Sequence, residues 1–319
     1  MAINTFAYAE IFQQMLDKQV IAKSTSGWME GNAGLLKYNG GNTVKIPKMT
    51  MDGLGDYSRD NGFVQGSASL VYETETLTQD RGRTFSLDSM DVDETNFVAS
   101  ASLLMSEFQR TKVIPEIDAY RYSKIASLAI AANANSASLQ GFSPAVGGYT
   151  PGVADIYSQL RADIAAIQDI AGAIPLVITM STATLNILEN STEIQRQLQV
   201  AQFQGGADIS FEVKSIDECP IIEAPSSRLK TLYDFADGST TGQTAGGFTV
   251  DTNAKNINWI ICAKNVPIAV SKTDKIRIFD PNTNQNADAW KIDYRKYHDI
   301  WIPDNQFQCL RVNVKEALS

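Results

Sequence analysis

The stretch from residue 91 to 132 constrains the fold most, because its helical periodicity runs far beyond the usual helix of about 11 to 12 residues. Asp91 and Glu94 have capping-box spacing, with aspartate in place of serine or threonine. The apolar positions that follow at helical spacing are Phe97, Ala101, Leu104, Phe108, Ile114, Ile117, Ile125, Leu128 and Ala132. A continuous helix would be roughly 60 Å long at about 1.5 Å per residue. Pro115 leaves a second interpretation open, in which two ordinary helices meet and proline lies in the first turn of the second.

A β-hairpin is predicted before this helix. Residues 43–49 and 68–79 have strand patterns, and the stretch between them, 52–67, is rich in turn-forming residues and contains Asn61-Gly62. Residues 84–90 are expected to lead from the hairpin back into the long helix. The return strand alternates threonine with glutamate and leucine, so its apolar face is weak.

A hairpin of this length is not stable alone, so it must lie on another surface. That surface is either its own domain or a neighbouring copy of the chain, and the polar strand faces favour the neighbouring copy. The predicted inter-subunit contact residues are Arg59, Asp60, Phe63, Glu73, Glu75, Arg81 and Arg83. For any one of the charged side chains, ordinary solvated surface is the alternative interpretation.

The remaining segments predict an arm before the hairpin and an α/β layer after the long helix. Residues 6–23 have helical spacing, 24–42 are expected to be extended, and the small residues at 133–149 mark a domain boundary. After this boundary a helix is predicted to begin at Thr150-Pro151 and to end at Gly172, followed by a strand at 174–181. A helix capped by Ser181 or Thr182 comes next, and 192–206 continue as helix. From residue 207 the period shifts to two. The strand candidates are ISFEVKSI, PIIEAP, LKTLYDF, INWIICAK, VPIAVSK, KIRIFDP, WKIDYRKYHDIWI and CLRVNVKE, and the last of them are expected to return to a sheet under the long helix.

Composition excludes several classes of protein. The 319 residues allow two domains, and 44% hydrophobic and 20% charged residues are typical of a globular chain. The net charge of −9 argues against a dedicated nucleic-acid-binding protein, which normally has a basic face. No apolar run reaches the length of a membrane helix, and the first ten residues do not have the pattern of a signal peptide. Cys219, Cys262 and Cys309 fit neither a disulfide framework nor metal-ligand spacing, so we expect buried thiols in a reducing compartment.

The search for catalytic chemistry finds no site. The single histidine, His298, lies in an alternating strand pattern and is expected to be structural. The sequence has no G-x-S-x-G or phosphate-loop motif, and the Gly246-Gly247 pair precedes no helix. Acidic residues at 88–94 could bind calcium, but a helix N-terminus explains them better. We therefore predict no catalytic, cofactor-binding or metal-binding residue, and Tyr120 and Tyr122 are expected to pack rather than to stack on bases.

Four stretches, taken in order, carry a resemblance to a known family. They are RGRTFSLDSMDVDETNF with FQRTKVIPEIDAYRYSKIA, PLVITMSTATLNILENS, IDECPIIEAPSSRLKT, and KIRIFDPNTNQNADAWKIDYRKYHDIWI. Together with the arm, hairpin and long helix, this order resembles the major capsid protein of tailed bacteriophages, with the Hong Kong 97-type fold, and especially phages of Gram-positive bacteria. Each motif alone is of modest specificity.

The resemblance implies an α+β fold and a structural, non-enzymatic role. The implied parts are an N-terminal arm at 1–40, an E-loop hairpin at 41–90, a spine helix with part of the P-domain at 91–149, an α/β A-domain at 150–270, and closing P-domain strands at 271–319. The implied function is self-assembly into hexamers and pentamers of an icosahedral shell around double-stranded DNA. The protein would lie in the virion and assemble in the cytoplasm of the host bacterium.

The resemblance also implies partners. These are other copies of the chain, a portal protein, a separate scaffolding protein, possible decoration protein, and packaged DNA bound weakly and non-specifically. Some relatives crosslink a hairpin lysine to a neighbour, but residues 52–67 contain no lysine, and Lys45 and Lys48 lie at the base. An encapsulin-type compartment shell is the nearest alternative. An enzyme or a β-rich adhesin fits less well, because the chain has one histidine and a long helix.

Overall fold

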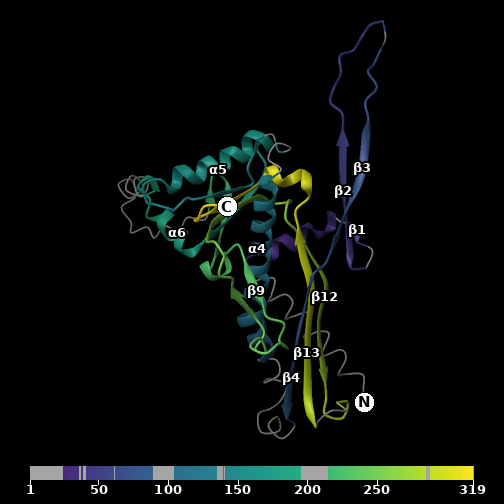
Figure 1. The fold of residues 1–319 in the computed structure, drawn as a ribbon, viewed down its shortest axis with the longest axis vertical. Helices are drawn as coiled ribbons and strands as arrows, with labels where there is room; N and C mark the ends of the chain where they lie inside the picture. Colours follow the sequence, from purple (N-terminus) through teal and green to yellow (C-terminus); the bar gives the residue numbers. More distant parts are fainter. Residues whose placement is uncertain are drawn as a thin grey trace, which may run out of the picture.

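The computed structural model describes residues 24–35, 37–38, 41–60, 62–88, 104–134, 139, 141–194, 215–284 and 288–318. Figure 1 shows an elongated molecule in which a long hairpin and a long three-stranded sheet lie along one side, and a six-stranded sheet with its helices lies on the other. The long helix α4, Ile114–Ala132, runs between these two parts.

The described part of the long helix is continuous through Pro115. Residues 104–108 are α-helical, Gln109–Val113 form a π-helical turn (η2), and α4 follows directly, with right-handed helical angles at Val113 and Ile114. A proline ring inside a regular helix clashes with the carbonyl four residues before it, and the wider π turn gives room at that place. The single-helix interpretation is therefore confirmed from residue 104 onward, and the predicted capping box lies outside the described residues.

The six-stranded sheet has the order β5-β14-β11-β6-β8-β7. Its strands are β5 (Ala145–Gly147), β14 (Leu310–Val314), β11 (Ile257–Ala263), β6 (Leu176–Ser181), β8 (Cys219–Ala224) and β7 (Ser215–Ile216). Every residue of β6 and β11 is buried, because helices cover both faces of the sheet. Trp259 donates to Asp163 of α5 (Ile156–Ala171) on one face. On the other face Tyr122 of α4 lies against Thr179.

The predicted connections in this part are largely confirmed. Ser181 caps α6 (Thr182–Glu189), since its hydroxyl accepts from the Thr184 N–H at 3.2 Å. Gly172 ends α5 with a φ of 76°, as the sequence predicts. The start of α5 was predicted wrongly: Asp155, not Thr150, is its N-cap. Residues 151–155 form a turn instead, in which the Gly152 carbonyl accepts from the N–H of residues 155 and 156.

The three-stranded sheet has the order β12-β13-β4 and is antiparallel throughout. Its strands are β12 (Ile268–Phe279), β13 (Ala289–Trp301) and β4 (Gln79–Asp88). Ile276, Ile292 and Tyr294 pack against Met105 and Ile117 of the long helix. A smaller pair, β9 (Tyr233–Phe235) and β10 (Phe248–Val250), lies beside α4.

The structure corrects the prediction for these strands in three places. Residues 79–88 do not simply lead into the helix but form β4, which pairs with β13 along its whole length. VPIAVSK and KIRIFDP form one strand, β12, with an irregularity between Ser271 and Thr273. The last strands were expected to return to the sheet under the long helix. Strands β12 and β13 do so, whereas β14 pairs with β11 in the six-stranded sheet.

The hairpin forms a third sheet, β1-β2-β3, with β1 (Lys37–Tyr38), β2 (Thr43–Met51) and β3 (Ala68–Thr76). Its base packs on the body through Val44, Ile46 and Leu77. These side chains contact a set on β12 and β13 made up of Ile268, Val270, Tyr297 and Trp301. Beyond this cluster β2 and β3 project away from the rest of the chain (Figure 1).

The segment before the hairpin differs from the extended arm that was predicted. Gly27–Leu35 form a 3-10 helix (η1) that lies against β12. The three residues before it, Ser24 to Ser26, surround the buried carboxylate of Asp118 in α4. The predicted helix at residues 6–23 lies outside the described residues, as does most of the one at 192–206.

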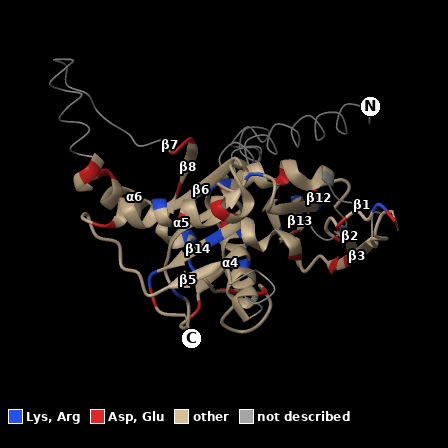
Figure 2. Ribbon diagram, turned by 90° about the horizontal axis from the view of Figure 1, so that it is seen from above, with Lys and Arg blue, Asp and Glu red and all other residues tan. Residues whose placement is uncertain are grey.

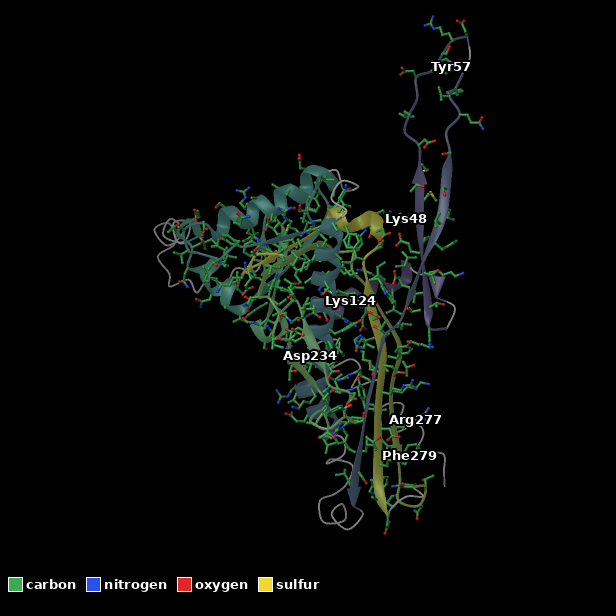
Figure 3. All side chains as sticks on the ribbon, in the orientation of Figure 1. Lys48, Tyr57, Lys124, Asp234, Arg277 and Phe279 are labelled. Atoms are coloured by element: carbon green, nitrogen blue, oxygen red, sulfur yellow. The ribbon has the colours of Figure 1, made fainter. Side chains whose placement is uncertain are left out.

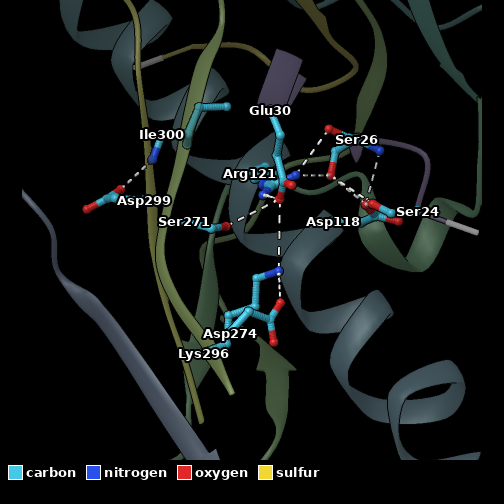
Figure 4. Close-up of polar contacts among 10 residues, drawn as sticks. All are labelled: Ser24, Ser26, Glu30, Asp118, Arg121, Ser271, Asp274, Lys296, Asp299 and Ile300. Atoms are coloured by element: carbon cyan, nitrogen blue, oxygen red, sulfur yellow. Dashed lines mark hydrogen bonds and ion pairs between the residues drawn. The ribbon is translucent and has the colours of Figure 1, made fainter. Parts of the chain in front are cut away.

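A buried charge network explains why this segment folds against the body (Figure 4). The Asp118 carboxylate, fully buried, accepts from the backbone N–H of Thr25 (3.2 Å) and Ser26 (3.1 Å), from the hydroxyls of residues 24, 25 and 26, and from Arg228 (3.1 Å). One turn along α4, Arg121 donates to the Ser26 carbonyl and pairs with Glu30. In the sequence, serines such as these indicate a solvated loop. In the structure, charged side chains of the helix bind them.

Candidate interaction surface

The hairpin presents an apolar face to solvent. In an antiparallel pair, residues opposite each other share a face, and the faces alternate along each strand. Pro47 lies opposite Tyr72, Met49 opposite Leu70, and Met51 opposite Ala68, all on the side away from Val44 and Ile46. We call this set the outer face. Met51 is 71% exposed and Leu70 is 52% exposed, so the outer face is largely uncovered in the single chain.

The distal loop between β2 and β3 adds a second group of exposed apolar side chains. Leu54, Tyr57, Phe63 and Val64 are all exposed, with Phe63 at 90%. The loop is nevertheless ordered by local contacts: the Tyr57 and Phe63 rings lie 4.9 Å apart, and backbone hydrogen bonds join positions 58 and 62 in both directions. Figure 3 shows Tyr57 far from the body of the molecule, at the end of the hairpin.

At the start of this loop Asp52 accepts from the backbone N–H and the hydroxyl of Ser67, at 2.7 and 2.9 Å. Both bonds stabilise the carboxylate and lower the pKa of Asp52 below its ordinary value. The two ends of the loop are therefore tied together where the hairpin strands end. These bonds, together with the contacts near its tip, give the distal loop a defined conformation. A defined conformation suits a surface that binds a partner.

An exposed apolar surface of this kind needs a partner. Soluble single chains rarely expose contiguous apolar patches, and two strands alone are marginally stable in water. The outer face and the distal loop together form the main group of exposed large apolar side chains in the described residues. Residues 73–78 are mainly polar and predict a polar hairpin. The apolar alternation in 47–51 and 70–72 is the sequence signal for the outer face.

Three of the seven predicted contact residues lie in the distal loop. Arg59, Asp60 and Phe63 are exposed and close to the end of the hairpin. Two others lie on the inner face near the body. Glu73 pairs with Lys48 at 3.3 Å, and burial raises the pKa of Glu75 although the charge of Lys124 partly opposes this.

The remaining two, Arg81 and Arg83, already have partners within the chain. Arg81 donates to Glu116 (2.7 Å) and to the carbonyls of Ala236 (2.8 Å) and Gly247 (3.2 Å). Arg83 donates to the Thr244 carbonyl at 3.2 Å. These arginines hold the ends of the glycine-rich loop 236–247 against β4. A contact of any of the seven residues with a neighbouring copy remains a prediction.

The described residues contain no group of three metal-ligating side chains and no helix that is long and apolar enough to cross a membrane. The acidic side chains at 88–94 lie outside what the structure describes. Cys219 and Cys262 are buried free thiols, as predicted, whereas Cys309 is only half-buried. Burial raises the pKa of Cys262 to about 12, so this thiol is unreactive near neutral pH.

His298 is a buried structural residue of β13, as the sequence predicts. It is 4% exposed, and its ring packs edge-on against Tyr120 at 5.6 Å. Burial, followed by the positive charges of Arg121, Lys296 and Arg81, lowers the pKa of His298 well below its ordinary value. The folded chain therefore keeps this imidazole neutral.

This histidine makes folding sensitive to mild acid. Below about pH 6.5 the unfolded chain binds a proton at His298 that the folded chain does not bind, so stability falls as the pH falls. We expect a loss of about 1 kcal/mol in the free energy of unfolding between pH 7 and pH 5.5. Urea unfolding at the two pH values measures it, with His298→Phe as the comparison. An equal loss in that variant would show that other groups cause the effect.

Comparisons with known proteins agree with this architecture. No protein-family model and no curated protein sequence matches the chain. Among solved structures, the bacteriophage PhiM1 mature capsid aligns with a TM-score of 0.55 at 12% identity, covering 86% of this chain and 82% of that one. The capsid of Staphylococcus phage Andhra gives 0.51 at 12%, with 87% and 81% covered. The capsid of a native GTA particle gives 0.55 at 10%, with 87% and 86% covered. The chain thus has the α+β, Hong Kong 97-type fold of phage capsid proteins.

Proposed function

We propose that this protein is the major capsid subunit of a tailed bacteriophage and that it self-assembles through the hairpin. The exposed outer face, on a strand pair that projects from a capsid-type fold, is the observation that carries the proposal. Covering that face with a neighbouring copy removes apolar surface from water at about 25 cal/mol per Å². The division into arm, hairpin, helix and two domains is part of this proposal, with β4 assigned to the sheet of β12 and β13, and β14 to the six-stranded sheet.

Electron microscopy of the chain expressed alone tests self-assembly. We expect closed shells, capsomer rings or tubes, with a matching high-mass peak in size-exclusion chromatography. Because the proposed shell needs a separate scaffolding protein, a monodisperse monomer is followed by co-expression with one. A monomer under both conditions would contradict the proposal.

The proposed shell consists of hexamers and pentamers, lies in the virion and assembles in the host cytoplasm. Its further candidate partners are a portal protein and a decoration protein. A Gram-positive host is also proposed, and one of the similar structures comes from a Staphylococcus phage. The protein acts as a structural component, not as an enzyme. Packaged phage DNA, as opposed to a cargo enzyme, in particles isolated from the natural source would separate this function from an encapsulin-type shell.

Binding to DNA is expected to be weak. The net charge is −9, and for the described residues Figure 2 shows blue and red segments interspersed on the ribbon without a continuous basic stripe. With few phosphates neutralised at once the affinity is low, and binding through phosphate charge alone is weakened by salt and has no sequence preference. In a filter-binding assay the free subunit should release double-stranded DNA as salt is raised from about 50 to 200 mM. Tight binding that resists this salt would contradict the expectation.

Assembled particles are expected to contain no covalent crosslink from the distal loop. The loop has no lysine, and Lys48 at the hairpin base forms ion pairs with Glu73 (3.3 Å) and Asp304 (3.2 Å). Denaturing gel electrophoresis of boiled particles should show a single band at the subunit mass of 34.9 kDa. A ladder of multimers would refute this prediction.

A further inference from the structure

We infer that Asp299 and Thr78 form a pin that fixes the direction in which the hairpin leaves the body, and thereby the angle at which it meets a second copy of this chain. The angle at which the hairpin meets a second copy rests on the proposed function. The direction of the hairpin is a property of the single chain and is argued from its geometry alone.

The pin lies where the hairpin joins the three-stranded sheet. β3 ends at Thr76 and β4 begins at Gln79, so only Leu77 and Thr78 connect a strand of the hairpin to a strand of the body. A two-residue junction can bend at a few backbone angles, and the hairpin beyond it is long. A small rotation at the junction therefore moves the distal loop by a large distance.

Hydrogen bonds hold both residues of the junction, Leu77 and Thr78. The Leu77 N–H donates to the Asn42 carbonyl at 3.0 Å, and its own carbonyl accepts from the Tyr297 hydroxyl at 2.9 Å. The Thr78 N–H and hydroxyl both donate to Oδ2 of Asp299, at 2.9 and 2.8 Å. The junction is thus held by β13 on one side and by Asn42, the residue just before β2, on the other.

Asp299 itself is fully buried and satisfied on both carboxylate oxygens. Its Oδ1 accepts from the Tyr120 hydroxyl of α4 at 2.7 Å and from the Ile300 N–H at 2.8 Å. A buried carboxylate that holds two donors of one residue cannot exchange them for water at low cost. Asp299 therefore joins the hairpin junction, β13 and the long helix at a single point.

The ion pair at the hairpin base is more exposed to solvent than the contact between Asp299 and Thr78. The Lys48–Asp304 pair at the hairpin base has an Asp304 side chain that is 64% exposed. Exposed pairs of this kind contribute little to holding a conformation. This contrast provides a matched control, because Asp299→Asn and Asp304→Asn make the same chemical change at two carboxylates of the body that contact the hairpin or its junction.

The test is an intrachain distance measured by pulsed electron paramagnetic resonance. Spin labels are placed at Asp56→Cys in the distal loop and at Ser158→Cys on α5, both exposed, in a Cys309→Ser background. Labelled chain is diluted with unlabelled chain so that only distances within one chain contribute. We expect one narrow distribution for the parent and for Asp304→Asn, and a broad one for Asp299→Asn and Thr78→Val. Thr78→Ser, which keeps the hydroxyl, should restore the narrow one.

One further variant and a fallback keep the result decisive. Leu188→Ala in α6 destabilises the core far from the junction, so a narrow distribution there separates release of the pin from general destabilisation. If Asp299→Asn does not fold, Thr78→Val decides. Narrow distributions in both pin variants would overturn the inference.

Particle shape tests the second half of the inference. Thr78→Val particles in electron microscopy should vary in diameter more than parent particles. Uniform particles from a variant with a broad distance distribution would overturn the assembly half alone. Failure of the parent chain to assemble, both alone and with a scaffolding protein, would overturn the proposed function, and the distance measurement would still decide the pin.

Discussion

Replacing Asp118 with alanine is expected to lower the free energy of unfolding by about 3–5 kcal/mol. The change removes the carboxylate that pairs with Arg228 and leaves the backbone N–H groups of Thr25 and Ser26 without their acceptor. Both donors lie at a fully buried carboxylate, so water cannot replace it at low cost. Urea unfolding of the unassembled subunit measures the loss.

The matched control is another carboxylate on the same long helix. Glu107 pairs with Arg110 at 2.7 Å, but both side chains are more than half exposed. Glu107→Ala should therefore change the free energy of unfolding by no more than about 0.5 kcal/mol. If the two variants were equally mild, residues 24–26 could not be held by Asp118. Limited proteolysis supplies a second readout, because cleavage near residue 26 should become faster in Asp118→Ala alone.

The largest effect on assembly is expected from charges on the outer face of the hairpin. The double substitution Met49→Asp and Leu70→Asp places two carboxylates side by side where Met49 and Leu70 are opposite each other. Losing the burial of two such side chains costs about 3 kcal/mol per contact. A loss of that size raises the subunit concentration needed for association about a hundredfold. Particles should disappear in size-exclusion chromatography and electron microscopy.

The same substitution should leave the fold unchanged. Met49 is 58% exposed in the single chain, so a polar residue there is already in water. The circular dichroism spectrum of the free subunit is expected to match that of the parent, and the melting temperature to fall only by the effect of the repulsion between the two carboxylates. Val153→Asp with Leu232→Asp is the control, because both side chains are similarly exposed but lie outside the hairpin. Equal loss of particles in the control would show that the outer face has no special role.

The sequence predicts elements well where one periodicity dominates. The stripe of α5, with Ile156, Leu160, Ile164 and Ile167 buried, follows from spacing alone. The strand β4 is missed because Asp80, Arg81 and Arg83 suggest surface. In the structure the two arginines hold loop 236–247. A side chain bonded to a carbonyl more than a hundred residues away has no local signature.

In the candidate surface, too, some residues can be predicted from the local sequence and others depend on contacts between distant parts of the chain. Phe63 and the charges at 59 and 60 are predicted from an exposed turn, which is a local property. The outer face depends on the register between β2 and β3, which decides that Met49 and Leu70 share a side. The burial of Asp118 under a segment of serines and threonine depends on tertiary contacts that no periodicity reports.

The two-residue passage from β3 into β4 also determines how the molecule bears mechanical load. A neighbour that pulls on the hairpin along its length pulls β4 along its own axis, because the two strands follow each other in nearly one line (Figure 1). Hydrogen bonds between antiparallel strands run perpendicular to the strands, so such a force shears the whole β4–β13 ladder, from Asp88–Ala289 to Gln79–His298, at once. A force across the strands would open the ladder one pair at a time. In the proposed shell, pressure from inside would draw neighbouring subunits apart within the plane of the wall, and the direction of β4 would favour resistance to that force.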